Sequence, residues 1–203
     1  MADPALPDPA LPETAPPATA AAWRGATQHR FPAAVRDGTL PGSAFDTWLA
    51  QDALFVAALL AFQARLVARA PRAAQGVLAA GVVGLCQELD WFDGQAAQRG
   101  VDLAVAPLPA TVAYTGLLHR LDAAPYPVAV TALEVLERVY LLSWSHAAPA
   151  AEPFRACVEH WTAPGFAAYV DALGVLAREA GAPADAVAEV LEHETAFWQA
   201  ALG

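Results

Sequence analysis

The sequence predicts an all-α fold, a single-domain bundle of about seven or eight helices. Two observations lead to this expectation. Hydrophobic residues make up 57% of the 203 residues, and many of them are alanine, which favours helix. Proline and glycine recur at intervals suited to helix ends, whereas sustained apolar–polar alternation, the pattern of half-buried strands, is absent. A chain of this length can build one well-buried core.

The first 19 residues differ in composition from the rest of the chain. They contain a short DPALP repeat, and their proline density cannot sustain a helix. We therefore expect residues 1–19 to form a disordered tail rich in proline and alanine, and residues 20–203 to form the helical domain.

Breaks rich in proline and glycine separate the predicted helices of this domain. They lie at residues 37–42, 70–71, 94–100, 107–109, 125–127, 147–153 and 181–183. A long helix is expected to begin near Ser43, which would serve as its N-cap. Thr162 is expected to cap a later helix that has Pro164 in its first turn.

Charge and composition exclude several classes of function. The net charge is −10, lysine is absent and the arginines are scattered, so the chain lacks the basic surface that nucleic acid or an anionic membrane requires. No apolar run reaches the roughly 18 residues of a membrane-spanning helix. Two cysteines are too few for a disulfide framework, and no signal peptide is evident. We expect a soluble cytoplasmic protein without nucleic-acid or membrane partners.

The most informative feature is a set of acidic residues on apolar helix faces. Side chains at i±3 and i±4 are neighbours on a helix. Four acids have mainly apolar and aromatic residues at those positions: Asp52, Glu88, Glu137 and Glu194. Other acids have bland or polar neighbours: Asp90, Glu134, Asp171 and Glu192. Of these, Glu134 forms an ordinary i,i+4 pair with Arg138.

An ionised carboxylate buried without partners costs several kcal/mol, so four such positions need an explanation. If the helices share a core, the four carboxyl groups can converge on one ligand site. Alternatively, each acid lies at a helix edge and bonds a backbone group or an arginine. Nearby aromatic residues offer flat surfaces on which a planar organic ring could stack.

These residues and their order resemble the TenA family of thiamin-related hydrolases, which shares the haem-oxygenase-like helical fold. The resemblance covers about residues 23–201. Its landmarks are HRF (29–31), RDGTL (36–40), FDTWLAQDALF (45–55), ELDWF (88–92), Tyr114, PYPVAVTALEVLERVYLLSW (125–144), HWTAPGFAAYV (160–170) and ETAFW (194–198).

One departure indicates a branch within this family. Many TenA proteins carry a catalytic cysteine in the region of the fourth predicted helix, whereas Cys86 and Cys157 lie elsewhere. Glu137 stands where the glutamate of the cysteine-less branch is found. This branch hydrolyses aminopyrimidine, and in some members its formylamino precursor, to hydroxymethylpyrimidine. The resemblance therefore implies thiamin salvage, with weak or absent thiaminase activity.

The resemblance also implies roles for individual residues. Asp52 would bond the amino group and ring nitrogen of the pyrimidine, and Glu194 would exchange a proton on the opposite side. Glu137 would act as a base toward water or contact the aminomethyl group. The remaining predicted contacts are Tyr114, Tyr140, Glu88 and Phe55. Ala53 and Phe55 depart from the family pattern, which indicates a somewhat different substrate or lost activity.

Three alternatives remain beside this cofactor-free hydrolase, for which no metal is expected. The first is a carboxylate-bridged di-iron oxygenase on the same fold, with His193 joining three glutamates as ligands. The second is a haem protein that uses His29. The third is a non-catalytic small-molecule-binding homologue. By resemblance, the partner is a pyrimidine substrate and the assembly is a homodimer or homotetramer.

Overall fold

The computed structural model describes residues 17–181 and 185–203, which form helices joined by loops without any strand. The helices in this part of the chain are α1 (Pro17–Thr27), α2 (Arg30–Arg36), α3 (Gly42–Arg69), α4 (Arg72–Arg99), α5 (Pro109–Ala123), α6 (Tyr126–His146), α7 (Arg155–Trp161), α8 (Pro164–Ala180) and α9 (Asp185–Leu202). The all-α prediction is confirmed. The described residues hold one helix more than the upper predicted number, and α2 and α7 have only seven residues each.

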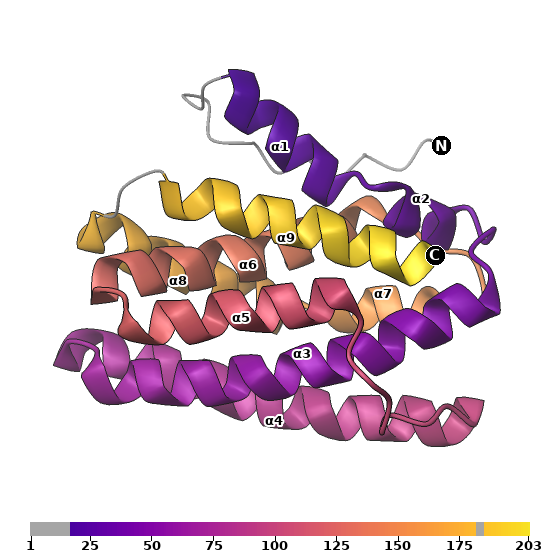
Figure 1. Ribbon diagram of the computed structural model, residues 1–203, viewed down its shortest axis with the longest axis horizontal. Coiled ribbons are helices and arrows are strands. Elements are labelled where there is room, and N and C mark those ends of the chain that lie inside the picture. The colour runs from indigo at the N-terminus through magenta and orange to yellow at the C-terminus, as the bar shows by residue number, and fades with distance from the viewer. Residues whose placement is uncertain (1–16, 182–184) are drawn as a thin grey trace.

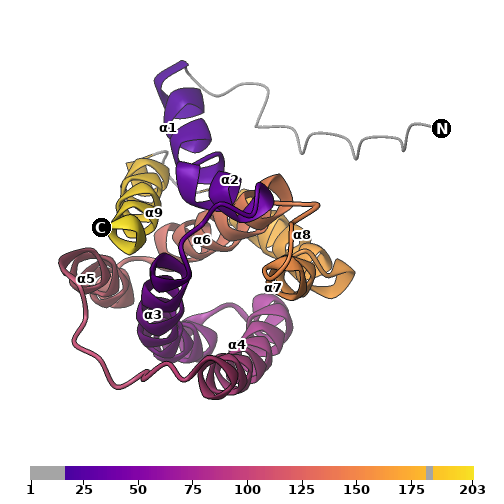
Figure 2. The same cartoon turned by 90° about the vertical axis from the view of Figure 1, so that its right-hand side faces the viewer.

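The longer helices form a bundle that surrounds a common interior. Helices α3, α4, α5, α6 and α9 run side by side along the long axis of the molecule (Figure 1). Helix α3 packs against α4 and α5, α6 packs against α8 and α9, and further contacts join α5 to α9 and α4 to α8. These contacts close a ring of six helices, which Figure 2 shows nearly end on. Helix α1 lies outside this ring against α9 and α6.

Large aromatic side chains fill one part of the interior. Trp48, Trp144 and Trp198 come from α3, α6 and α9, and each is at most 1% exposed. The ring centroids of Trp48 and Trp144 are 5.1 Å apart, and Phe31 of α2 stacks on Trp198 at 5.2 Å. Burial of one such ring stabilises the fold by about 2–3 kcal/mol, so this cluster fixes how the three long helices approach one another.

Glycine ends two of the helices as their sequences predict. Gly100 follows α4 and Gly181 follows α8, with φ of 68° and 67° respectively. This left-handed conformation is strained for any residue that has a Cβ atom. Residues 182 and 183 of the predicted 181–183 break lie outside the described residues.

The two predicted N-caps are wrong. Helix α3 begins at Gly42 with Pro41 as its N-cap, and Ser43 already lies in the first turn. Thr162 ends α7, where its hydroxyl donates to the carbonyl oxygen of Val158 at 2.7 Å. A threonine hydroxyl satisfies the carbonyl four residues earlier as readily as it caps a following helix, and here the preceding helix competes successfully.

The start of the fold lies earlier than expected. Helix α1 begins at Pro17, three residues before the predicted domain boundary. Proline is tolerated in a first helical turn because its missing N–H group would have no partner there. The tail predicted from the density of prolines was therefore too long at its C-terminal end. The rest of that tail, residues 1–16, lies outside the described residues.

By length and composition, α3 alone among the described helices could cross a membrane, contrary to the expectation that no segment would qualify. However, 56% of its most apolar stretch is buried inside the bundle. It also carries the buried polar residues Gln51, Asp52 and Gln63. Helix α3 is thus a core helix of the bundle, as in a soluble protein.

Candidate active site

Four helices of the ring each contribute one acidic side chain to the interior. Asp52 of α3, Glu137 of α6 and Glu194 of α9 are 2%, 6% and 3% exposed, and Glu88 of α4 is partly buried. Burial raises the pKa of Glu137 well above its ordinary value, and the charges of the other three acids raise it further. Charges act on a buried group in this way when they lie in the same region of the protein interior. The structure thus brings all four predicted acids into one site.

Asp52 is paired with a tyrosine from the opposite helix. The hydroxyl of Tyr140 on α6 donates a hydrogen bond to Oδ2 of Asp52. Burial raises the pKa of Asp52 well above its usual range, the bond from Tyr140 opposes this rise, and the charges of Glu88 and Glu194 add to it. Burial therefore favours the protonated carboxyl group, while the tyrosine gives the ionised form its main support.

Glu194 forms the second carboxyl–tyrosine pair. The hydroxyl of Tyr114 on α5 donates to Oε1 of Glu194 at 2.6 Å. Burial raises the pKa of Glu194 to about 8, although the bond from Tyr114 lowers it. The Tyr114 ring is held between Phe55 and His193, with ring centroids 4.3 and 5.3 Å away. Near pH 7 this carboxyl group is mostly protonated and can donate a proton.

Glu137 differs from both of these pairs. Among the described residues, no side chain or backbone group forms a hydrogen bond with its carboxyl group. A buried carboxyl group without a partner is unfavourable, and native proteins usually satisfy such groups. Glu137 is therefore the acid of this cluster that is free to bond a ligand or a water molecule.

Glu88 connects the cluster to an aromatic wall. The indole N–H of Trp161 donates to Oε1 of Glu88 at 2.8 Å. Burial raises the pKa of Glu88 to about 7, and the bond from Trp161 opposes this rise. Trp161 meets Trp91 edge to face, and His160 stacks on Trp91 with ring centroids 4.8 Å apart. Trp161 was not singled out in the sequence because its partner lies 73 residues away.

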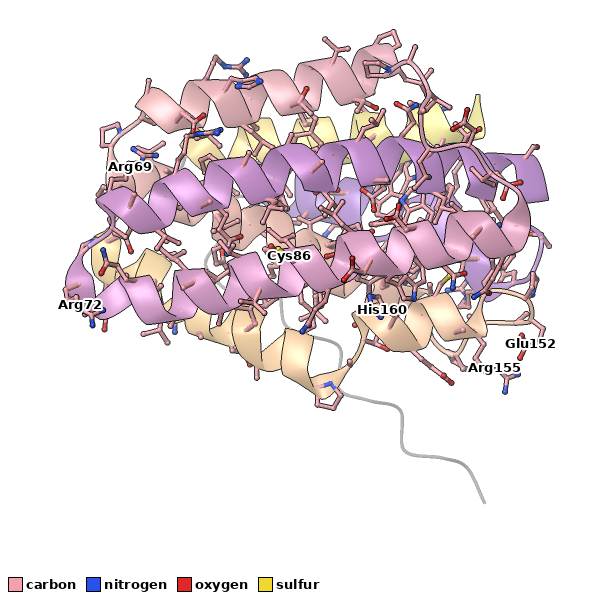
Figure 3. The ribbon with its side chains drawn as sticks, turned by 90° about the horizontal axis from the view of Figure 1, so that it is seen from below. Arg69, Arg72, Cys86, Glu152, Arg155 and His160 are labelled. Carbon is pink, nitrogen blue, oxygen red and sulfur yellow. The ribbon has the colours of Figure 1, made fainter. Side chains whose placement is uncertain are left out.

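The cysteines offer little for thiol chemistry at this site. Cys86 is exposed on α4, which faces the viewer in Figure 3. Cys157 is buried on α7, and burial raises the pKa of its thiol to about 12, which keeps the thiol protonated. A protonated thiol is a poor nucleophile.

The two histidines of the alternative hypotheses have other partners. His193 stacks on Tyr114, and its Nε2 lies 3.9 Å from the Glu189 carboxylate one turn earlier. His29 is the N-cap of α2, where its Nδ1 accepts a hydrogen bond from the backbone N–H of Phe31. In the described part of the chain, no group of three or more histidine, cysteine, aspartate or glutamate side chains is arranged to hold a metal ion. This geometry gives no support to the di-iron or haem alternatives.

Two further polar residues adjoin the cluster and were missed in the sequence. Tyr169 of α8 accepts a hydrogen bond from the buried Gln63 of α3 at 2.8 Å. The charge of Glu137 contributes to the raised pKa of Tyr169, after burial. The helices that carry the two residues pack together, with Arg138 of α6 donating to the carbonyl oxygen of Val170 of α8 at 3.4 Å. The neighbour rule applied to acids could have found Tyr169 as well, because Phe166 and Leu173 stand three residues before it and four residues after it on α8.

An open hollow of about 500 Å³ lies elsewhere on the surface, between α1 and α9. Its lining includes Ala22 and Gly25 of α1 and Thr195 and Gln199 of α9, but none of the four clustered acids. The hollow thus faces a different side of α9 from Glu194.

Comparisons with known proteins agree with the fold. A model of the TENA/THI-4/PQQC family matches residues 17–203. A Glycine max protein named "probable bifunctional TENA-E protein" is 33% identical, over 89% of this chain and 88% of its own length.

Solved structures with the same fold include two TenA proteins. A TenA homologue from Pyrococcus furiosus superposes with a TM-score of 0.85 at 23% identity, covering 91% of this chain and 96% of its own. A TenA family transcription regulator from a Silicibacter species superposes with a TM-score of 0.82 at 21% identity, covering 89% of this chain and 91% of its own. At these identities the structures establish the fold, whereas the family match covers every described residue. The chain belongs to the TENA/THI-4/PQQC family.

Proposed function

We propose that this protein is a hydrolase of thiamin salvage that converts aminopyrimidine to hydroxymethylpyrimidine by carboxylate acid–base catalysis. The observation that carries this proposal is the convergence of Asp52, Glu137 and Glu194 in one buried site, with two of the three bonded to tyrosines. Membership of the family and the likeness to a TENA-E protein support it.

The reaction requires one proton to be delivered and one water molecule to be activated. Water attacks the exocyclic carbon of the aminomethyl group, the C–N bond breaks, a C–O bond forms, and the departing amine takes up a proton. A carboxyl group in an apolar environment can donate near neutral pH, whereas an ionised one can accept. A site with several carboxyl groups in different surroundings supplies both functions.

The surroundings of each acid suggest its role. Glu194, with its pKa near 8, is suited to protonate the pyrimidine ring or share a proton with it. Asp52 lies beside the Tyr140 hydroxyl and is suited to bind the ring amino group. Glu137, without a bond to the described residues, is suited to accept the proton of the attacking water or to hold the aminomethyl group.

Phe55 and Glu88 complete the proposed substrate contacts. Phe55 stacks on Tyr114, so it supports the tyrosine that bonds Glu194 and presents an apolar surface without a hydroxyl. Glu88 is held by Trp161 and acts on the site through its charge on Glu137 and Asp52. A planar pyrimidine matches a site that combines aromatic surfaces with a few carboxyl groups.

The test is turnover of aminopyrimidine by the purified chain, with hydroxymethylpyrimidine and ammonia both quantified. Replacement Glu137→Gln or Glu194→Gln is expected to lower kcat at least 100-fold, the usual loss for a group that transfers a proton. Glu192→Gln is the matched control, because Glu192 is an exposed acid on the same helix as Glu194. Ammonia must appear in equal amount to the alcohol. Absence of turnover by the wild type would refute the hydrolase and favour a non-catalytic binding protein.

A further inference from the structure

Gln63 is a fully buried amide whose hydrogen bonds are only partly made. It lies on α3 with 0% exposure. Its Nε2 is 2.8 Å from the carbonyl oxygen of Leu78 on α4 and 2.8 Å from the hydroxyl oxygen of Tyr169 on α8. Its Oε1 is buried without a hydrogen-bond partner among the described residues. A buried amide held in this way is costly, which calls for a reason beyond packing.

The carbonyl oxygen of Leu78 fixes which way the Gln63 amide points. A backbone carbonyl can only accept a hydrogen bond, so the amide atom that faces Leu78 must be the nitrogen. The two amide protons then go to Leu78 and to the oxygen of Tyr169. A flipped amide would place Oε1 of Gln63 against the carbonyl oxygen of Leu78 at 2.8 Å, a contact between two acceptors. Tyr169 is therefore an acceptor toward Gln63.

This direction leaves the proton of Tyr169 for the other side of its hydroxyl group. No described residue accepts a bond from that hydroxyl. Glu137 lies near enough for its charge to raise the pKa of Tyr169, and it too has no hydrogen bond to the described residues. Helices α6 and α8 pack together at this level, where Arg138, next to Glu137, donates to the carbonyl oxygen of Val170, next to Tyr169, at 3.4 Å. A free donor and a free carboxyl group are thus carried by neighbouring segments of these two helices.

Gly81 of α4 makes room for this arrangement. A Cβ atom at that position would lie 2.1 Å from both Nε2 of Gln63 and the hydroxyl oxygen of Tyr169. Such distances are far below van der Waals contact, so any larger residue would separate the amide from the phenol. The backbone of α4 therefore supplies both the carbonyl that orients Gln63 and the space in which it bonds Tyr169.

We propose that Gln63 is a positioning residue that turns the hydroxyl proton of Tyr169 toward Glu137 and the reacting groups beside it. The proposal rests on the proposed hydrolase function for its catalytic consequence. With the tyrosine oxygen occupied by the amide, the proton is delivered in one direction without any cost of reorientation during the reaction. Gln63 itself does not touch the substrate.

A double-mutant cycle with Tyr169→Phe separates this role from a merely structural one. Gln63→Met keeps the length of the side chain but removes its donor, and we expect kcat to fall about tenfold with little change in KM. In the Tyr169→Phe background the same replacement should leave kcat unchanged, because no hydroxyl remains to be oriented. An equal loss of kcat in both backgrounds, or a change confined to KM, would overturn the proposal.

A matched control and a second replacement keep the test independent of folding. Gln51 is another buried glutamine of α3, but it bonds the loop before α5. Gln51→Met should therefore change kcat by the same factor in both backgrounds. Gln63→Glu supplies an acceptor that draws the Tyr169 proton away from Glu137, so it should lower kcat at least as much as Gln63→Met. Retention of wild-type kcat by Gln63→Glu would contradict the proposed proton direction.

A spectroscopic measurement tests the arrangement apart from the reaction. If the wild type does not hydrolyse aminopyrimidine, the proposed function fails, but the hydrogen-bond direction can still be read. The Raman doublet of tyrosine reports whether a phenol donates or accepts, and subtraction of the Tyr169→Phe spectrum isolates this tyrosine from the other three in the chain. Gln63→Met should change the Tyr169 doublet, and an unchanged doublet would refute the assigned direction.

Discussion

Replacement of Glu194 by glutamine is expected to stabilise the protein progressively as the pH rises. Burial raises the pKa of Glu194 from 4.5 to about 8. In the unfolded chain the carboxyl group loses its proton near pH 4.5, whereas in the folded chain it keeps that proton to about pH 8. Between these values the folded state holds the extra proton, so the contribution of this group to stability is complete below pH 4.5 and is lost as the pH rises through 8.

The size of the effect follows from the shift. One pKa unit corresponds to about 1.36 kcal/mol, so the cost of keeping Glu194 protonated grows by about 3 kcal/mol between pH 4.5 and pH 7. Glutamine has the same shape, accepts the bond from Tyr114 and does not titrate. Relative to the wild type, Glu194→Gln should therefore gain about 3 kcal/mol of unfolding free energy between pH 4.5 and 7.

Urea unfolding of both proteins at pH 4.5, 5.5, 6.5 and 7.5 measures this difference. Glu192→Gln serves as the control because Glu192 is exposed on the same helix, and its difference from the wild type should stay nearly constant across the series. If the difference for Glu194→Gln is also independent of pH, Glu194 is not held protonated in the folded state. A variant less stable than the wild type at pH 7.5 would likewise refute the reasoning.

Three further predictions concern other contacts. Tyr114→Phe removes a bond that lowers the pKa of Glu194, so the alkaline limb of the pH profile of kcat/KM should move to higher pH; an unmoved limb would exclude Glu194 as the acid. Gln51→Ala leaves the backbone N–H of Leu108 without its acceptor and should lower the unfolding free energy by about 1–3 kcal/mol in urea. Trp198→Ala empties a fully buried site and should cost about 3–5 kcal/mol in the same assay, well above the Gln51 variant. A loss of unfolding free energy for Trp198→Ala no larger than that for Gln51→Ala would contradict the full burial of the Trp198 ring.

The fold class and the acidic cluster could be predicted because both depend on local patterns. Proline and glycine mark helix ends wherever they occur, and the spacing of three and four residues shows which side chains share a face. Asp52, Glu137 and Glu194 were separated in this way from Glu192 and Asp171, which are exposed in the structure. Glu88 is only partly buried, which fits its place at the edge of the cluster.

The partners of these acids could not be predicted from local patterns. Tyr114 and Glu194 are 80 residues apart, and Gln63 and Tyr169 are 106 apart, so their hydrogen bonds exist only after the helices have packed. The errors at Thr162 and at the start of α1 have the opposite origin. A threonine can cap the helix that follows it or bond the helix that precedes it, and a proline can interrupt a helix or stand in its first turn. The sequence did not decide between these outcomes.

The bond between Trp161 and Glu88 gives the protein a built-in optical probe. Burial raises the pKa of Glu88 to about 7, and its Oε1 lies 2.8 Å from the indole nitrogen of Trp161. The Trp161 ring lies 4.5 Å from that of Trp91 and 4.8 Å from that of Trp144, close enough for excitation to pass among the indoles. Emission of this cluster should therefore respond to ionisation of Glu88 around neutral pH, and to a ligand that displaces the carboxyl group, without any added label.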